Sequence, residues 1–173
     1  MALSVQDRDI VDHFREFIED VVGGDERYGE PARVNAGGVM GSRFVVTDEC
    51  WLEAVVRTGI PEVRVGFVTA DPAVRDGITE MLADAGQTMA IFVGAGFEEA
   101  GLDWPNPTVD SAAAAGEFSF TTPFPIEELS DLQSDDVRDK VLRMLEGYLI
   151  AFGATILPDD ESDFDEDMDD EEE

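Results

Sequence analysis

The stretch EVRVGFVTADPAVRDGITEMLADAG (residues 62–86) decides the fold, because the spacing of its apolar residues changes part-way along it. In its first part, Val63, Val65 and Phe67 alternate with residues that face the opposite way. A period of two residues is typical of a strand that buries one of its faces. We therefore expect a half-buried strand at the start of this stretch.

The second part of the stretch has the spacing of a helix. Asp71 is placed to cap this helix, because a carboxylate there accepts hydrogen bonds from free backbone N–H groups of the first turn. Pro72 follows, where its missing N–H costs nothing, and Gly86 can adopt the left-handed conformation at the end. The apolar residues fall on one stripe of the helix: Val74, Ile78, Met81, Leu82 and Ala85.

The residues before this stretch indicate further strands joined by short turns. RFVVT (residues 43–47) and WLEAVVR (residues 51–57) are rich in β-branched and aromatic residues, which favour strands. A shorter strand is expected within residues 32–39, where glycines weaken the pattern. Strands that follow one another through short turns predict an antiparallel meander, and the helix that begins at Asp71 then covers one face of it.

Long helices are expected near both ends of the folded part. Ser4 is placed to cap a first helix that runs to Val22. Ser134 is placed to cap a last helix that ends near Phe152, with Gly153 as its stop. Each of the two segments carries an apolar stripe at helical spacing, so each helix is expected to pack against the sheet.

The segment between them is less regular. Residues 117–122 alternate and predict a strand, residues 88–93 fit either a strand or the start of a helix, and residues 109–115 are compatible with a helix. The sequence thus predicts an α+β fold with an antiparallel sheet of four to five strands and three main helices. We expect a single globular domain over residues 1–157 and an acidic, disordered tail over residues 158–173, which lacks apolar surface.

The chain is strongly acidic, since 41 Asp and Glu against 11 Lys and Arg give a net charge of -30. Among the basic residues only Lys140 is a lysine. This composition, with its abundant alanine, valine and glycine, resembles that of proteins from extremely halophilic archaea. Direct nucleic-acid binding is not expected, because it needs clustered basic residues that replace counterions.

Because like charges repel, we expect the fold to depend on salt. The Debye length lengthens from about 3 Å at 1 M salt to about 10 Å at 0.1 M, so dilution strengthens the repulsion. Below about 0.5 M salt the protein is expected to loosen, which urea unfolding followed by circular dichroism at a series of salt concentrations measures. Fully cooperative unfolding in salt-free buffer would contradict this expectation.

Cysteine and histidine are too few for several classes of site. Cys50 and His13 are the sole residues of their types, which excludes an internal disulfide, a paired-cysteine metal framework and a multi-histidine metal site. No apolar run reaches the length of about 20 residues that a membrane span needs, and the start of the chain lacks a signal-peptide pattern. We expect a soluble, cytoplasmic protein without a membrane partner, cofactor or metal.

The predicted order of elements resembles the small α+β fold of YbjN-type proteins and of type III secretion chaperones of the CesT kind. The residues that carry this resemblance are the meander over residues 43–69, the helix that opens at Asp71-Pro72, and the strand followed by a helix over residues 118–152. The resemblance implies no catalytic residues. It implies that the fold binds segments of partner proteins or dimerises.

Four aromatic residues are candidates for a partner-binding surface: Phe118, Phe120, Phe124 and Trp104. If the strand that contains Phe118 lies at a sheet edge, its aromatic residues can present an apolar groove. Exposed strand edges and apolar patches are common sites of protein recognition.

Two glycine-rich segments are candidates for anion binding. Arg33 and Arg43 flank GGVMG (residues 37–41), so these two arginines are the candidate anion-binding residues. VGAGFEEAG (residues 93–101) is similar to a dinucleotide-binding turn, but its two adjacent glutamates would repel a pyrophosphate. A flexible turn or an irregular helix is the better interpretation of the second segment.

The sequence contains no recognisable set of catalytic side chains. We therefore expect a non-enzymatic protein-interaction or chaperone-like module that binds another protein or itself. Two alternatives stay open. One is a small-molecule or metal-binding enzyme or sensor that uses Asp, Glu and Arg in a cleft. The other is an acidic decoy that mimics nucleic acid.

Overall fold

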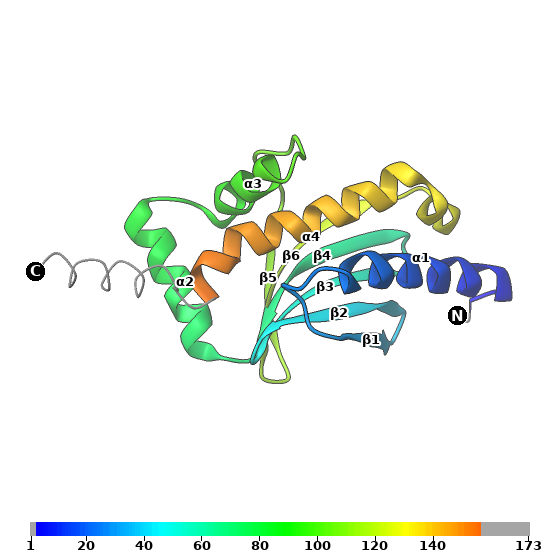
Figure 1. Cartoon of the computed structure of the whole chain (residues 1–173), viewed down its shortest axis with the longest axis horizontal. Helices are drawn as coiled ribbons and strands as arrows, with labels where there is room; N and C mark the ends of the chain where they lie inside the picture. The colour runs from blue at the N-terminus through cyan, green and yellow to red at the C-terminus, as the bar shows by residue number, and fades with distance from the viewer. Residues whose placement is uncertain (1–2, 157–173) are drawn as a thin grey trace, which may run out of the picture.

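The structure, a computed structural model, describes residues 3–156 and contains one antiparallel sheet with helices on one side of it (Figure 1). The strands are β1 (Pro31–Ala36), β2 (Val39–Thr47), β3 (Cys50–Arg57), β4 (Glu62–Thr69), β5 (Asp110–Ala114) and β6 (Glu117–Pro125). The helices are α1 (Val5–Gly23), α2 (Pro72–Ala85), α3 (Met89–Glu99), α4 (Asp135–Ile156) and the short 3-10 helix η1 (Leu129–Gln133). The strand order is β1-β2-β3-β4-β6-β5, so β6 lies between β4 and β5.

The predicted α+β class and the antiparallel meander are confirmed. The predicted numbers of elements are too low, because the described residues form six strands and four α-helices. The alternation in β4 has the expected consequence, since Val63, Val65 and Phe67 all belong to the hydrophobic core. β3 pairs with β4 along its whole length and with β2 on its other side.

The helix that follows β4 begins and ends as predicted. The side chain of Asp71 accepts a hydrogen bond of 2.9 Å from the backbone N–H of Ala73. Gly86 has a φ of 66°, the left-handed conformation that glycine adopts without steric cost. Two residues of the predicted apolar stripe, Ile78 and Leu82, are buried. This helix is α2, and it ends the stretch that decides the fold.

For two segments between α2 and α4, only the tertiary structure shows which secondary structure they adopt. Residues 88–93, predicted as either a strand or a helix, are helical: they begin α3, where the hydroxyl of Thr88 accepts a hydrogen bond from the N–H of Ile91. The prediction of a helix for residues 109–115 is wrong, because residues 110–114 form β5. Pairing with β6 provides the backbone hydrogen bonds of this alanine-rich segment and outweighs its helix propensity.

The last helix is longer than predicted. α4 continues through Gly153 to Ile156, so the expected stop at Gly153 is wrong. The ring of Phe152 stacks on Phe67 of β4 at 4.6 Å, and the hydroxyl of Thr155 lies 3.7 Å from the sulfur of Met81. These contacts hold the last turn in place. The acidic tail predicted for residues 158–173 lies outside the described residues.

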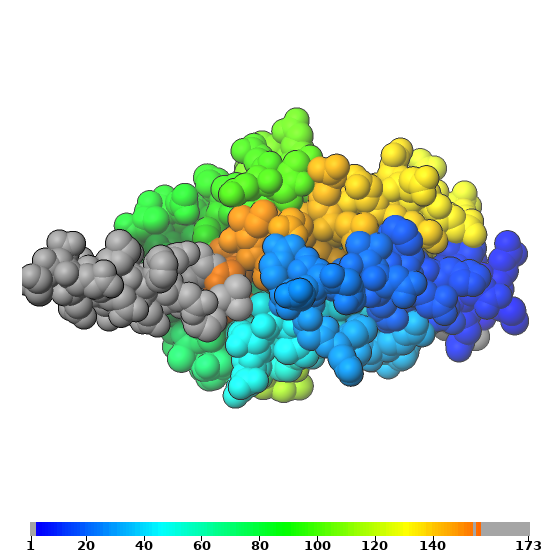
Figure 2. Space-filling model, in the orientation of Figure 1, coloured from blue at the N-terminus to red at the C-terminus, as the bar shows by residue number. Residues whose placement is uncertain are grey.

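The helices cover one face of the sheet. α1 and α4 lie along this face and α3 packs against α4, so that the three helices form a continuous layer in the space-filling view (Figures 1 and 2). Beneath them lies the core, in which the hydroxyl groups of Tyr148 and Thr122 form a buried hydrogen bond of 2.8 Å. Residues 3–156 place no helix over the opposite face.

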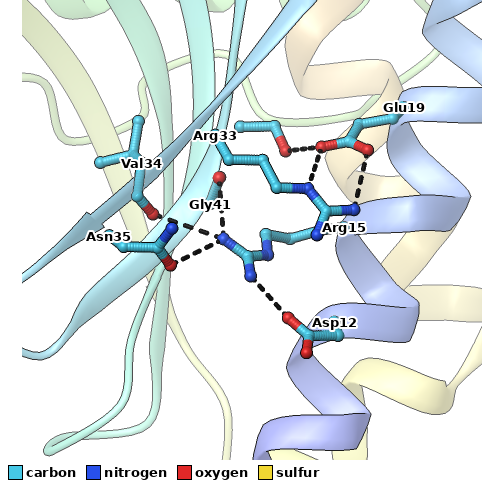
Figure 3. A network of polar contacts seen from close by, with 8 residues as sticks. Asp12, Arg15, Glu19, Arg33, Val34, Asn35 and Gly41 are labelled. Carbon is cyan, nitrogen blue, oxygen red and sulfur yellow. Dashed lines mark hydrogen bonds and ion pairs between the residues drawn. The ribbon is translucent and has the colours of Figure 1, made fainter.

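A buried arginine joins α1 to the first two strands. Arg15 is only 4% exposed, and its guanidinium donates to the side chain of Asn35 at 2.9 Å and to the carbonyl oxygen of Gly41 at 3.4 Å (Figure 3). The same guanidinium forms an ion pair with Asp12, one turn earlier on α1. This network ties the edge strand β1 to the helix layer.

On the uncovered face of the sheet, β4 and β6 approach each other closely at Gly66. Gly66 of β4 faces this side, and a methyl group there would overlap the backbone of β6 at Phe120 and Thr121. Only glycine permits this close approach. On the same face Arg43 of β2 forms an ion pair of 3.1 Å with Glu117 of β6, although two strands separate them in the sheet.

Candidate functional site

The two edges of the sheet differ in how well they are protected. β1 begins at a proline, Pro31, and carries the charged residue Arg33, which is held by Glu19 of α1. Proline and charged side chains are the usual means by which natural proteins protect an edge strand from further pairing. β1 is therefore a protected edge.

β5 at the other edge has little of this protection. Ser111 to Ala114 are small, uncharged and exposed, and the strand contains no proline, lysine or arginine. Within residues 3–156 no strand pairs with the outer side of β5. An unpaired edge of this kind presents a row of free backbone donors and acceptors that can pair with an additional strand.

An apolar groove lies beside this edge. Its volume is about 260 Å³, and it is lined by Phe118 and Phe120 of β6, by small residues of β5 and by Arg75 of α2. The guanidinium of Arg75 lies over the ring of Phe118, 4.3 Å from its centre. A strand added to β5 would place every second side chain on the side of this groove.

The carboxylates beside the β5 edge form ion pairs with arginines. Asp110 of β5 pairs with Arg64 at 3.1 Å, and Asp76 of α2 pairs with Arg75 at 2.8 Å. Glu117, just after β5, pairs with Arg43, as described above. Each of these carboxylates therefore has an arginine partner, although Arg43 is shared with Glu53 and Arg64 with Glu62.

The structure separates the four predicted partner-binding residues into two pairs. Phe118 and Phe120 line the groove, but Phe124 and Trp104 do not. The ammonium group of Lys140 lies 4.5 Å from the ring centres of both Phe124 and Trp104, and Phe124 is buried in the core. The condition that the Phe118 strand lies at an edge is not met, since β5 covers that side of β6.

The two predicted anion-binding arginines lie on opposite faces of the sheet. Arg33 faces the helices and binds both carboxylate oxygens of Glu19, each at 3.0 Å. Arg43 faces the uncovered side and binds Glu53 and Glu117. Both guanidinium groups therefore already have carboxylate partners, and they do not form one site.

Arg43 and its partners line a small hollow of about 120 Å³ on the uncovered face. Burial raises the pKa of the Glu53 carboxyl, and the nearby Arg43 guanidinium opposes that rise. Arg43 also lies over the ring of Trp51, 5.1 Å from its centre. Small-molecule sites usually have volumes of about 300–1,000 Å³, so this hollow is small for a substrate. Its charged groups are paired with each other.

The glycine-rich turn between β1 and β2 lies in a different hollow. Gly37 and Gly38 both have positive φ, and they line a depression of about 320 Å³ together with Arg8 of α1. Neither of the predicted arginines lines it. Arg8 is exposed and is followed by Asp9, so the local charge does not favour an anion.

The second glycine-rich segment has a packing role. Gly94 and Gly96 lie inside α3, where a methyl group on Gly94 would overlap the carbonyl of Pro105 and one on Gly96 that of Gly147 in α4. The absence of side chains lets α3 lie directly on α4. This arrangement agrees with the interpretation as a helix rather than a nucleotide-binding turn.

The sequence did not identify Arg75 and β5 as parts of the groove. The sequence held one signal for a hairpin here, which is Gly116 directly before the alternating residues 117–122, and in the structure Ala115 and Gly116 form the turn with positive φ. No local signal places α2 beside β5, because that neighbourhood depends on the insertion of β6 between β4 and β5.

Comparisons with protein-family models, with curated proteins and with solved structures found no match to this chain. The resemblance to YbjN-type and CesT-type folds therefore stays an expectation. In the described part of the chain no group of three or more Asp, Glu, His or Cys residues is arranged to hold a metal ion. None of the helices in that part has both the length and the apolar character needed to cross a membrane.

Proposed function

We propose that the protein is a non-enzymatic interaction module that binds another protein, or itself, by adding a strand to the β5 edge. The observation that carries this proposal is the combination of an unprotected edge strand with an apolar groove beside it. Strand addition uses backbone hydrogen bonds for affinity and side-chain pockets for selectivity. The proposal includes a saline cytoplasm as the setting, which the acidic composition favours.

The groove specifies what an added strand should contain. Because Phe118 and Phe120 form its walls, a strand with an apolar side chain facing them buries that side chain. The carboxylate of Asp110 is held by Arg64, so it keeps a hydrogen-bond partner when an apolar strand covers the edge.

The main alternative is an enzyme or sensor at the Arg43 hollow. The observation in its favour is the buried carboxyl of Glu53, which has a raised pKa and lies beside a guanidinium group. The hollow is small, and an anionic ligand would have to displace Glu53 and Glu117 from Arg43. We therefore rank this alternative second.

A matched pair of edge variants tests the proposal. Random peptides displayed on phage are selected for binding to the wild-type protein in molar salt, and the selected peptides are then measured against the variants. We expect Ala113→Lys to weaken binding at least about tenfold, or about 1.4 kcal/mol. The lysine side chain would occupy the groove, and its charge would oppose the addition of a strand to β5. Ala36→Lys on the opposite edge strand should leave binding unchanged.

The circular dichroism spectrum of both variants checks that they fold. Peptides that bind Ala113→Lys as well as they bind the wild-type protein would reject strand addition at β5. A failure to select any peptide would reject it as a site for segments of other proteins.

A further inference from the structure

The β5 edge is complementary to itself. In an antiparallel pair of two β5 strands that share a two-fold axis at Ala112, all five residues of each strand are paired, and any other centre pairs fewer of them. Asp110 then lies opposite Ala114 of the second copy, so no two carboxylates face each other. Like charges directly opposite one another would destabilise such a pair.

The charge of the protein restricts where two copies can meet. At a net charge of -30, most surfaces of one copy repel those of another. At the β5 edge, however, Asp110 and Asp76 are each paired with an arginine. These ion pairs reduce the repulsion between carboxylates where two β5 strands would meet, although the whole molecules repel.

The two-fold axis also brings the two grooves together. It runs perpendicular to the sheet, as it does in any antiparallel pair of identical strands, so the helices of both copies lie on the same side. The groove of one copy, with Phe118 and Phe120, then continues across Ser111 and Ala113 of both strands into the groove of the other. The small side chains leave room for this trough between the two α2 helices.

We infer that the occupant of the β5 edge is a second copy of this chain, which forms a two-fold dimer with one continuous sheet of twelve strands, six from each copy. This inference rests on the proposed strand addition at β5. It goes further by naming the partner, the two-fold axis and the pairing register. An extended segment of another protein is the competing occupant.

A single introduced cysteine tests the register. In an antiparallel pair, opposite residues have Cα atoms about 4.5–5.5 Å apart, within the range of about 4.4–6.8 Å that a disulfide spans. Ala112→Cys should therefore form a disulfide-linked dimer under mild oxidation, or with a short bismaleimide. The native thiol does not interfere, because Cys50 is 1% exposed and burial raises its pKa.

The matched control is Ala36→Cys on β1, which is also exposed in an edge strand. On a non-reducing gel we expect most of the Ala112→Cys protein at twice the monomer mass, and at least tenfold less crosslinking of Ala36→Cys. Light scattering should give a dimer for the wild-type protein and a monomer for Ala113→Lys.

The outcomes separate this inference from the proposed function. If Ala112→Cys crosslinks no more than Ala36→Cys, but the selected peptides still require an unmodified β5, the dimer is overturned and strand addition stands. If the crosslink is absent and the peptides also bind Ala113→Lys, both proposals fall. A dimer that persists in Ala113→Lys would overturn the β5 register.

Discussion

Replacing Arg15 by methionine is expected to lower the free energy of unfolding by about 3 kcal/mol, the largest effect predicted for a single side chain in this protein. Methionine keeps the apolar volume but removes every hydrogen bond of the guanidinium. The carbonyl oxygen of Gly41 then loses a buried donor, whereas the side chain of Asn35 is exposed and water can replace its partner (Figure 3). Asp12 is less affected, because its side chain is 34% exposed and water can solvate it.

The loss should be greatest at β1, which this network joins to α1. Urea unfolding in molar salt measures the global effect, and hydrogen exchange at the β1 amides measures the local one. Arg8→Met is the matched control, because Arg8 lies on the same helix and is exposed. It should change stability by no more than about 0.5 kcal/mol.

Equal stability of Arg15→Met and the wild-type protein would contradict this prediction. It would mean that the cost of removing the Arg15 charge from water offsets its interactions, as in some buried ion pairs. The Nε atom of Arg15 contributes to that cost, because it is buried without a hydrogen-bond acceptor among the described residues.

Gly96→Ala is expected to destabilise the protein by about 2 kcal/mol, even though alanine favours helices more than glycine does. The new methyl group would overlap the carbonyl oxygen of Gly147 and lie 3.1 Å from the side chain of Ala151, both on α4. A backbone oxygen cannot move aside by changing rotamer. The methyl group therefore forces α3 away from α4 and loosens the packing of Phe97.

Gly77→Ala is the matched control, since Gly77 lies inside α2 with no atom within 4 Å of the position of a new methyl group. This substitution should stabilise the protein by about 0.5–1 kcal/mol, because alanine loses less backbone entropy in a helix. Urea unfolding of the two variants in molar salt provides the comparison. Changes of the same sign in both would show that the packing of α3 on α4 does not govern the result.

The elements that the sequence predicted well are those with local signals. β4 and α2 follow from the change of apolar spacing at Asp71, and α2 has a cap at each end. Such signals act within one or two turns of chain, so they can be interpreted without knowledge of the partners.

The elements that could not be predicted from the sequence depend on contacts with residues distant in the chain. Residues 110–114 have no apolar alternation, and they become a strand because β6 provides their hydrogen bonds. Likewise, Arg15 falls on the apolar side of α1, and only the positions of β1 and β2 show which oxygen atoms receive its guanidinium.

For the candidate site, the sequence by itself determined the presence of Phe118 and Phe120 on one face of a strand. Only the tertiary structure decided that this strand is interior, that β5 is the exposed edge and that Arg75 lies across the groove. The physical reason is that side-chain direction follows from the local period of a strand. The neighbours of a strand follow from the packing of the whole sheet.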